Sequence, residues 1–122
     1  HMVGLVLRAS GGVILGRRPE EGLFGGLYDL PGGPVLPGED AIAAASRIGR
    51  ERLGLELAGA SSLGTLEHTL THLQLTLELV EARSGGAPSS SFYSRFVEVA
   101  PGASPGVGVS ALAKKALKRL RP

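Results

Sequence analysis

The chain has 122 residues, which is enough for one domain with a hydrophobic core. Its 43% hydrophobic and 20% charged residues are ordinary for a globular protein, and no apolar run approaches the roughly 20 residues that a transmembrane helix needs. The lack of cysteine excludes disulfides, a thiol nucleophile and iron–sulfur ligation by this chain. The net charge is only +2, but five of the 13 lysine and arginine residues lie within positions 114–121, which indicates an anionic partner.

The hydrophobic pattern predicts the element order β-β-β-α-β-β-β-α. In chain order, we expect strands at 3–8, 13–18 and 27–30, a helix at 40–53, strands at 63–67, 73–82 and 92–99, and a helix that starts after Ser110 and runs to 121. Between the two central strands the pattern breaks at 68–72, where we expect a loop. The order indicates an α+β domain with a mixed β-sheet and about two helices. We assign 3–122 to this domain and interpret residues 1–2 as an expression scar.

Local chemistry supports several of these elements. Leucines alternate with polar residues over 73–79, which is typical of a half-buried strand. Gly54 can end the first helix as a C-cap, and Ser110 can begin the last one as an N-cap. The residues of the last helix that we expect to face the core are Leu112, Ala116, Leu117 and Leu120.

The segment from Gly33 to Leu55 matches most of the Nudix pattern G-x5-E-x7-R-E-U-x-E-E-x-G-U, where U is an aliphatic residue. The matching positions, with their spacing kept, are Gly33, Glu39, Arg47, Glu51, Gly54 and Leu55. The chain therefore resembles Nudix domains, and this resemblance implies a Nudix fold. In such a box, three glutamates at helix positions i, i+3 and i+4 share one face and bind Mg²⁺, which neutralises a diphosphate and activates water.

Two of these three carboxylates are absent here. The three positions hold Ile48, Glu51 and Arg52, and neither an apolar side chain nor a cation can ligate Mg²⁺. We therefore predict no metal site and no catalytic residue in this chain. We interpret Glu39, Arg47 and Glu51 as ion pairs that fix the loop to the helix, with Arg47 or Arg52 as the partner of Glu51. A substitute metal site would need other carboxylates, for which the candidates are Glu67, Glu78 and Glu81.

Two further segments resemble the C-terminal domain of A/G-specific adenine DNA glycosylases, the MutY family. Residues 17–33, RRPEEGLFGGLYDLPGG, are similar to the family pattern R-P-x-x-G-L-x-x-G-L-W-E-F-P-G-G. Residues 68–72, HTLTH, followed by LQLTLELV, are similar to H-x-F-[ST]-H-x-x-L-x-L. The closing segment GVGVSALAKKALKRL also resembles the last helix of that family, so the resemblance covers nearly the whole chain.

This resemblance implies a Nudix-fold domain that does not hydrolyse nucleotides but reads 8-oxoguanine paired with adenine in double-stranded DNA. Thr71 would supply the hydroxyl that contacts the edge of the damaged base, Leu70 stands at the position of the family's phenylalanine, and His68 and His72 complete the DNA-binding loop. The resemblance also implies a bacterial, cytoplasmic and nucleoid-associated parent glycosylase. Its N-terminal catalytic domain, which would carry an iron–sulfur cluster, is an expected partner. We expect no cofactor in this chain and no membrane contact.

Each functional interpretation has an alternative. His68 and His72 can simply close a turn between strands. Lys114, Lys115, Lys118 and Arg119 are candidate phosphate contacts, but cations near a helix C-terminus also complement the helix dipole. For the whole chain, the alternatives are a stand-alone Nudix hydrolase of oxidised nucleoside diphosphate derivatives with a degenerate box, and a protein-interaction module.

Overall fold

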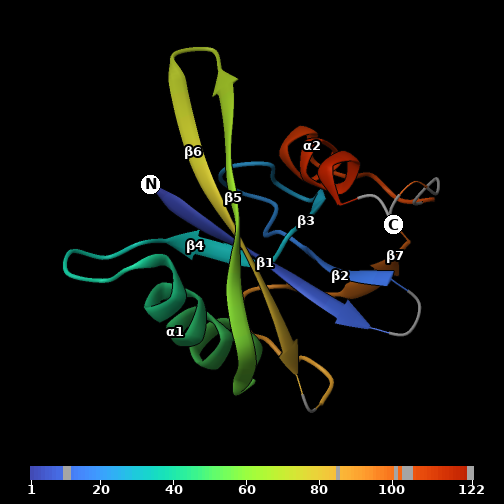
Figure 1. The fold of residues 1–122 in the computed structure, drawn as a ribbon. Helices are drawn as coiled ribbons and strands as arrows, with labels where there is room; N and C mark the ends of the chain where they lie inside the picture. Colours follow the sequence, from blue (N-terminus) through green and yellow to red (C-terminus); the bar gives the residue numbers. More distant parts are fainter. Residues whose placement is uncertain (10–11, 85, 101, 103–105, 121–122) are drawn as a thin grey trace.

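The computed structural model describes all 122 residues except 10–11, 85, 101, 103–105 and 121–122, and it does not describe the side chains of Leu70 and Ser84. Within the described residues, seven strands form one sheet and two helices pack on it (Figure 1). The strands are β1 (Met2–Ala9), β2 (Gly12–Arg17), β3 (Tyr28–Asp29), β4 (Gly32–Pro34), β5 (Leu57–Leu70), β6 (Leu73–Ser84) and β7 (Phe96–Val99), and the helices are α1 (Ala41–Leu53) and α2 (Ala111–Arg119).

The sheet is mixed, as predicted. Its main strand order is β3-β2-β1-β6-β5, while β4 pairs with β1 and β7 pairs with β2. β1 and β6 run parallel, and all the other strand pairs are antiparallel. The predicted α+β class with a mixed sheet and two helices is therefore confirmed.

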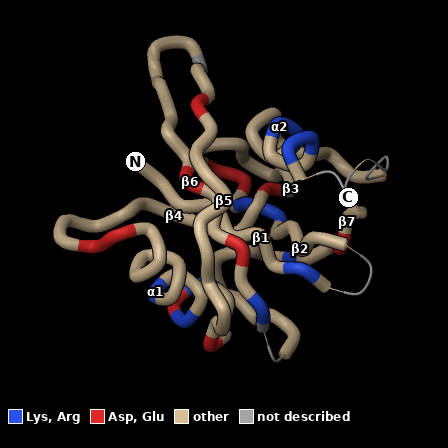
Figure 2. The backbone as a smooth tube through the Cα atoms, in the orientation of Figure 1, with Lys and Arg blue, Asp and Glu red and all other residues tan. Residues whose placement is uncertain are grey.

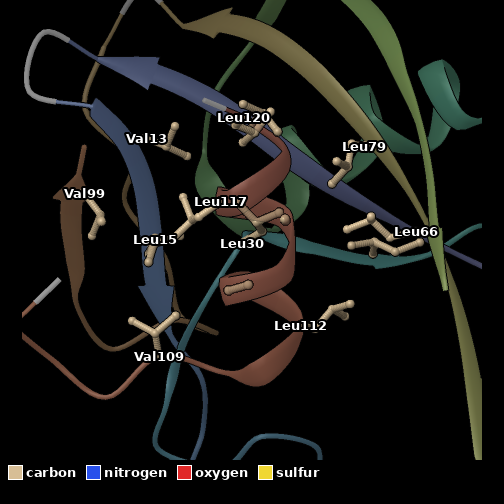
Figure 3. Packing of buried hydrophobic residues seen from close by; sticks show 14 of the residues in the cluster. Val13, Leu15, Leu30, Leu66, Leu79, Val99, Val109, Leu112, Leu117 and Leu120 are labelled. Atoms are coloured by element: carbon tan, nitrogen blue, oxygen red, sulfur yellow. The ribbon is translucent and has the colours of Figure 1, made fainter. Parts of the chain in front are cut away.

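The two helices cover different faces of the sheet, and each has its own hydrophobic core. Val6 of β1 packs in the core under α2, whereas its neighbours Leu5 and Leu7 pack in the core under α1. Because successive side chains of a strand point to opposite faces, this alternation explains why β1 is apolar from Met2 to Leu7. In Figure 3, leucines of α2 lie against valines and leucines of β2, β6 and β7.

Capping residues define the helix ends that the sequence predicted. The Asp40 side chain accepts a hydrogen bond from the Ala43 N–H at 2.8 Å, and Ser110 does the same for Ala113 at 3.0 Å. Each such N-cap is worth about 1 kcal/mol. α1 ends at Gly54, whose φ of 64° places it in the left-handed region. Every residue of the last helix that was expected to face the core is buried, namely Leu112, Ala116 and Leu117 of α2 and its C-cap Leu120.

The prediction was wrong about the region between the two central strands. The loop expected at 68–72 is a continuation of β5, and the connection to β6 is a two-residue turn formed by Thr71 and His72. The polar and histidine residues in this region break the hydrophobic pattern, so the pattern does not predict a strand there. Pairing with β6 nevertheless keeps the segment extended. β5 also begins earlier than expected, at Leu57 instead of residue 63, with irregular pairing between Ala58 and Gly64.

Three smaller differences concern strand ends. β4, which was not predicted, contains the flexible sequence Gly-Gly-Pro and forms only because it pairs with β1. β7 is shorter than the expected strand 92–99 and begins at Phe96; at its expected start, the Tyr93 N–H bonds to the Ser90 hydroxyl. Met2, one of the two residues interpreted as a scar, lies in β1 and pairs with Leu77. In the part of the chain that is described, neither helix is long and apolar enough to cross a membrane.

Candidate functional site

The two box positions that lack their glutamates meet at one point of the structure. Ile48 and Arg52 lie one turn apart on α1 and both face Gly33 of β4. A β-carbon at Gly33 would lie 3.3 Å from Ile48 Cδ1 and 3.3 Å from Arg52 Nη1. Ile48 itself is only 1% exposed and belongs to the core under α1. An apolar side chain and a guanidinium group therefore fill the space in front of Gly33.

Arg52 is held by the backbone of β4 and by Phe92, and not by a carboxylate. Its Nη1 donates to the Gly32 carbonyl oxygen at 2.7 Å, and its guanidinium carbon lies 3.9 Å from the centroid of the Phe92 ring. This is a cation–π contact at close range. The expected alternative, in which Arg52 pairs with Glu51, is not realised.

Arg47 instead organises the carboxylates of the box. Its guanidinium donates twice to Glu39, at 2.7 Å and 3.1 Å, and once each to the Pro34 carbonyl at 2.8 Å and to Glu51 at 3.2 Å. The hydrogen bonds from Arg47, followed by the one from the Leu36 N–H, lower the pKa of Glu39, and the same Glu39 contact raises the pKa of Arg47. The predicted ion pairs that fix the loop to the helix are present.

The remaining carboxylates do not fit a magnesium site. Of the three proposed substitutes, Glu67 accepts from Gln74 at 3.2 Å, Glu78 lies 3.7 Å from His1, and Glu81 pairs with Arg8 at 2.6 Å. Among the described residues, no group of three or more His, Cys, Asp or Glu side chains is arranged to hold a metal ion. Since Mg²⁺ bound for catalysis needs carboxylate ligands beside the substrate phosphates, no step of magnesium chemistry can be derived for this chain.

The cavity beside the box glycines is also small. It has a volume of about 10 Å³ and is lined by residues that include Gly32, Gly33, Arg18 and Phe24. This is roughly the room for one water molecule, whereas small-molecule sites typically enclose about 300–1,000 Å³. A nucleotide base does not fit this cavity in the observed side-chain conformations.

A buried polar network next to this cavity, which the sequence did not reveal, joins α2 to the sheet. Asp29 is 6% exposed and accepts hydrogen bonds from the Ser110 hydroxyl at 2.8 Å and from the Leu30 N–H at 2.9 Å, with Arg18 at 3.6 Å. Burial raises the pKa of Asp29, although these three contacts act to lower it. The Tyr93 hydroxyl accepts from the Gly32 N–H at 2.8 Å, and burial raises the pKa of Tyr93 as well. These contacts hold the ends of β3, β4 and α2 in place.

The predicted DNA-binding residues lie at the end of the β5–β6 hairpin, which projects beyond the rest of the molecule (Figure 1). Thr71 and His72 form the turn, and both are exposed. His68 is half-buried, with its ring centroid 6.4 Å from that of Phe24. The backbone of Leu70 pairs with Leu73, while its side chain lies outside the described part of the structure.

Two features of this hairpin end were missed by the sequence reading. Thr71 has a φ of 49°, a left-handed conformation that is unfavourable for a β-branched residue. Leu73 is 50% exposed, although it continues the stripe of the buried Leu75 and Leu77. Its exposure follows from its position, because the stripe extends past the edge of the core. The same period-2 pattern, followed up to the turn, identifies Leu73 as an apolar side chain at the tip.

Lysine and arginine residues lie along α2 (Figure 2), and their side chains divide into two pairs. Lys115 Nζ donates to the Glu67 carbonyl and Arg119 Nη1 to the Thr65 carbonyl, both at 2.5 Å, so these two cations tie α2 to β5. Lys114 and Lys118 are exposed, and within the described residues neither forms an ion pair. The four candidate phosphate contacts thus lie beside the hairpin, and two of them also have a structural role.

The fold and the box define a Nudix-type domain in which two of the three box glutamates are replaced. The profile of the family described as NUDIX domain matches residues 2–119. The chain therefore belongs to the NUDIX domain family.

Several solved structures share this fold. The MutT NUDIX hydrolase from Burkholderia pseudomallei is 22% identical, with a TM-score of 0.85 over 98% of this chain and 95% of that chain. The MutT protein from Methanosarcina mazei Go1 is 21% identical, with a TM-score of 0.82 over 97% of this chain and 89% of that chain. DR0079 from Deinococcus radiodurans is 25% identical, with a TM-score of 0.78 over 97% and 80% of the two chains.

One curated relative matches part of the sequence. The low-salt glycan biosynthesis protein Agl8 of Haloferax volcanii is 42% identical over 66 residues, which is 54% of this chain and 42% of the relative's length. The match therefore spans less than half of that relative.

Proposed function

We propose that this NUDIX domain recognises its ligand without magnesium-dependent hydrolysis, and that the ligand is double-stranded DNA with 8-oxoguanine opposite adenine. The observation that carries the first half is the meeting of Ile48 and Arg52 at Gly33, in the place where the box needs carboxylates. The second half rests on the HTLTH segment, because the residues that resemble the family's recognition loop lie at an exposed hairpin end.

In this proposal the hairpin end reads the base and α2 contacts the backbone. The Thr71 hydroxyl can both donate and accept a hydrogen bond, which suits the C8 carbonyl and the N7–H that distinguish 8-oxoguanine from guanine. Lys114 and Lys118 are free to contact phosphates, which adds affinity that does not depend on sequence but weakens with salt. Adenine removal belongs to a partner, the N-terminal catalytic domain of a parent glycosylase, so this chain alone excises nothing.

The test compares binding of this chain to matched duplexes with an 8-oxoguanine·adenine or a guanine·adenine pair, by fluorescence anisotropy at moderate salt. We expect a preference for the damaged duplex that Thr71→Ala reduces by about 5- to 150-fold, corresponding to about 1–3 kcal/mol for a base contact. Thr71→Ser keeps the hydroxyl and should retain most of the preference. Thr69→Ala, at an exposed position of the same hairpin, is the matched control. Equal binding of both duplexes by the unmodified chain would refute base recognition.

A second candidate function is hydrolysis of oxidised nucleoside diphosphate derivatives. The comparisons favour it over the glycosylase reading, because similar structures that cover nearly the whole chain are named MutT or NUDIX hydrolases. The box geometry opposes it, since Glu51 is the one glutamate left at the three metal positions and it contacts Arg47. Mg²⁺-dependent release of phosphate or pyrophosphate from 8-oxo-dGTP, abolished by Glu51→Gln, would establish this function and overturn the proposal above.

A further inference from the structure

The guanidinium group of Arg52 is fixed in place, but only some of its N–H groups form hydrogen bonds to the described residues. One of its N–H groups bonds to the Gly32 carbonyl, and its flat face rests on Phe92. Arg52 is half-buried. Among the described residues that are not exposed, every fully buried side-chain nitrogen has a hydrogen-bond partner. The remaining N–H groups of Arg52, which bond to no described protein atom, therefore face solvent.

The carboxylates around Arg52 are engaged elsewhere. Glu39 and Glu51 both bond to Arg47, and Asp29 faces Arg18 at 3.6 Å. Arg52 is thus a cation without a carboxylate partner in the described part of the chain, at the position where a NUDIX box has a metal ligand. Because Phe92 and Gly32 already restrict its side chain, binding an anion would cost little further conformational entropy.

We propose that Arg52 forms a phosphate-binding site that works without metal. A planar guanidinium binds two oxygens of a phosphate group through parallel N–H donors, so the side chain itself supplies the positive charge that Mg²⁺ supplies in a metal-binding box. The ligand class is a phosphate group, either of a free nucleotide or of a nucleic-acid backbone. The site lies at the C-terminal end of α1, away from the tip of the β5–β6 hairpin (Figure 1), and does not depend on lesion recognition.

The test is an NMR titration of the ¹⁵N-labelled chain with inorganic pyrophosphate in the presence of EDTA. We expect saturable shifts of the amides of Gly32, Gly33 and Arg52. Arg52→Gln should weaken this binding about ten-fold or more, as expected for loss of a hydrogen bond from a charged group. Arg50→Gln is the control, because Arg50 is an exposed cation on the same helix; it should leave the affinity unchanged. Arg52→Lys keeps the charge without the paired donors and should fall between the two.

Two further arms identify the source of the phosphate and protect the test from folding defects. The same titration is run with dGTP and with an undamaged DNA duplex. The ligand that shifts the amide signals of Gly33 and Arg52 identifies whether the phosphate comes from a free nucleotide or from a nucleic-acid backbone. If Arg52→Gln fails to fold, the shift map of the unmodified chain decides. Shifts confined to α2, no saturable shift near Gly33, or equal affinity of a folded Arg52→Gln variant would each overturn the proposal.

Discussion

Restoring the two missing box glutamates tests whether Ile48 and Arg52 alone prevent Mg²⁺ from binding to the box. In the double variant Ile48→Glu/Arg52→Glu, three carboxylates including Glu51 would lie on one face of α1. Without metal, the variant loses the burial of Ile48, worth about 1.5–3 kcal/mol, and the charge-assisted bond from Arg52 to Gly32, worth about 1.5–3 kcal/mol. We therefore expect a free energy of unfolding at least about 3 kcal/mol lower than that of the unmodified chain, before any charge repulsion is added.

Divalent metal should recover part of this loss. At a Mg²⁺ concentration 100 times the dissociation constant, binding to the folded state alone adds about 2.7 kcal/mol, which corresponds to a rise in melting temperature of roughly 10 °C for a domain of this size. Differential scanning calorimetry in MgCl₂ and in EDTA measures the shift. The neutral double variant Ile48→Gln/Arg52→Gln is the control and should not respond to the metal. An equal Mg²⁺ response of the unmodified chain, or none in the double-glutamate variant, would refute this account of the box.

Three further predictions concern the strained backbone of Thr71 and the carboxyl groups of Asp29 and Glu39. Thr71→Gly should raise the free energy of unfolding by roughly 1 kcal/mol in urea denaturation, because glycine adopts the positive φ of this turn without strain; a clear loss of stability would contradict the strained turn. The pKa of Asp29 is raised by burial, so its contribution to stability is greatest below the pKa of the unfolded state and is lost as the pH rises through the folded pKa. Asp29→Asn should therefore gain stability relative to the unmodified chain as the pH is raised through this range, and an unchanged difference between the two proteins would exclude this effect. The pKa of Glu39 is lowered by Arg47, so its contribution is present above the unfolded pKa and is lost as the pH falls through the folded one; Glu39→Gln should remove this acid-dependent loss in urea titrations, and an identical acid profile would show that the pair does not stabilise the fold.

The four cations of α2 have different structural roles although they carry the same charge. Lys115 and Arg119 bond to backbone carbonyls of β5, while Lys114 and Lys118 remain exposed. Their spacing in the sequence does not separate these roles, because the deciding partners are more than forty residues away in the chain. The structure assigns the first pair to helix docking and leaves the second pair exposed.

The sequence by itself determined the features that depend on local chemistry. Gly54 and Ser110 cap the helices as predicted, because capping involves only neighbouring backbone groups. The α+β class followed from hydrophobic periodicity, and the absence of two of the three box carboxylates followed from the identity of Ile48 and Arg52 alone, since neither side chain can ligate Mg²⁺.

Tertiary structure alone decided what those residues do instead. β4 exists because β1 pairs with it, and Phe92 lies under Arg52 only because the fold brings together segments forty residues apart. The hairpin end that carries Thr71 and His72 is exposed because β5 and β6 continue past the core, which no local pattern records. Contacts between distant segments depend on how the whole chain closes, and for that reason the position of the guanidinium in the box and the projection of the hairpin could be read only from the folded molecule.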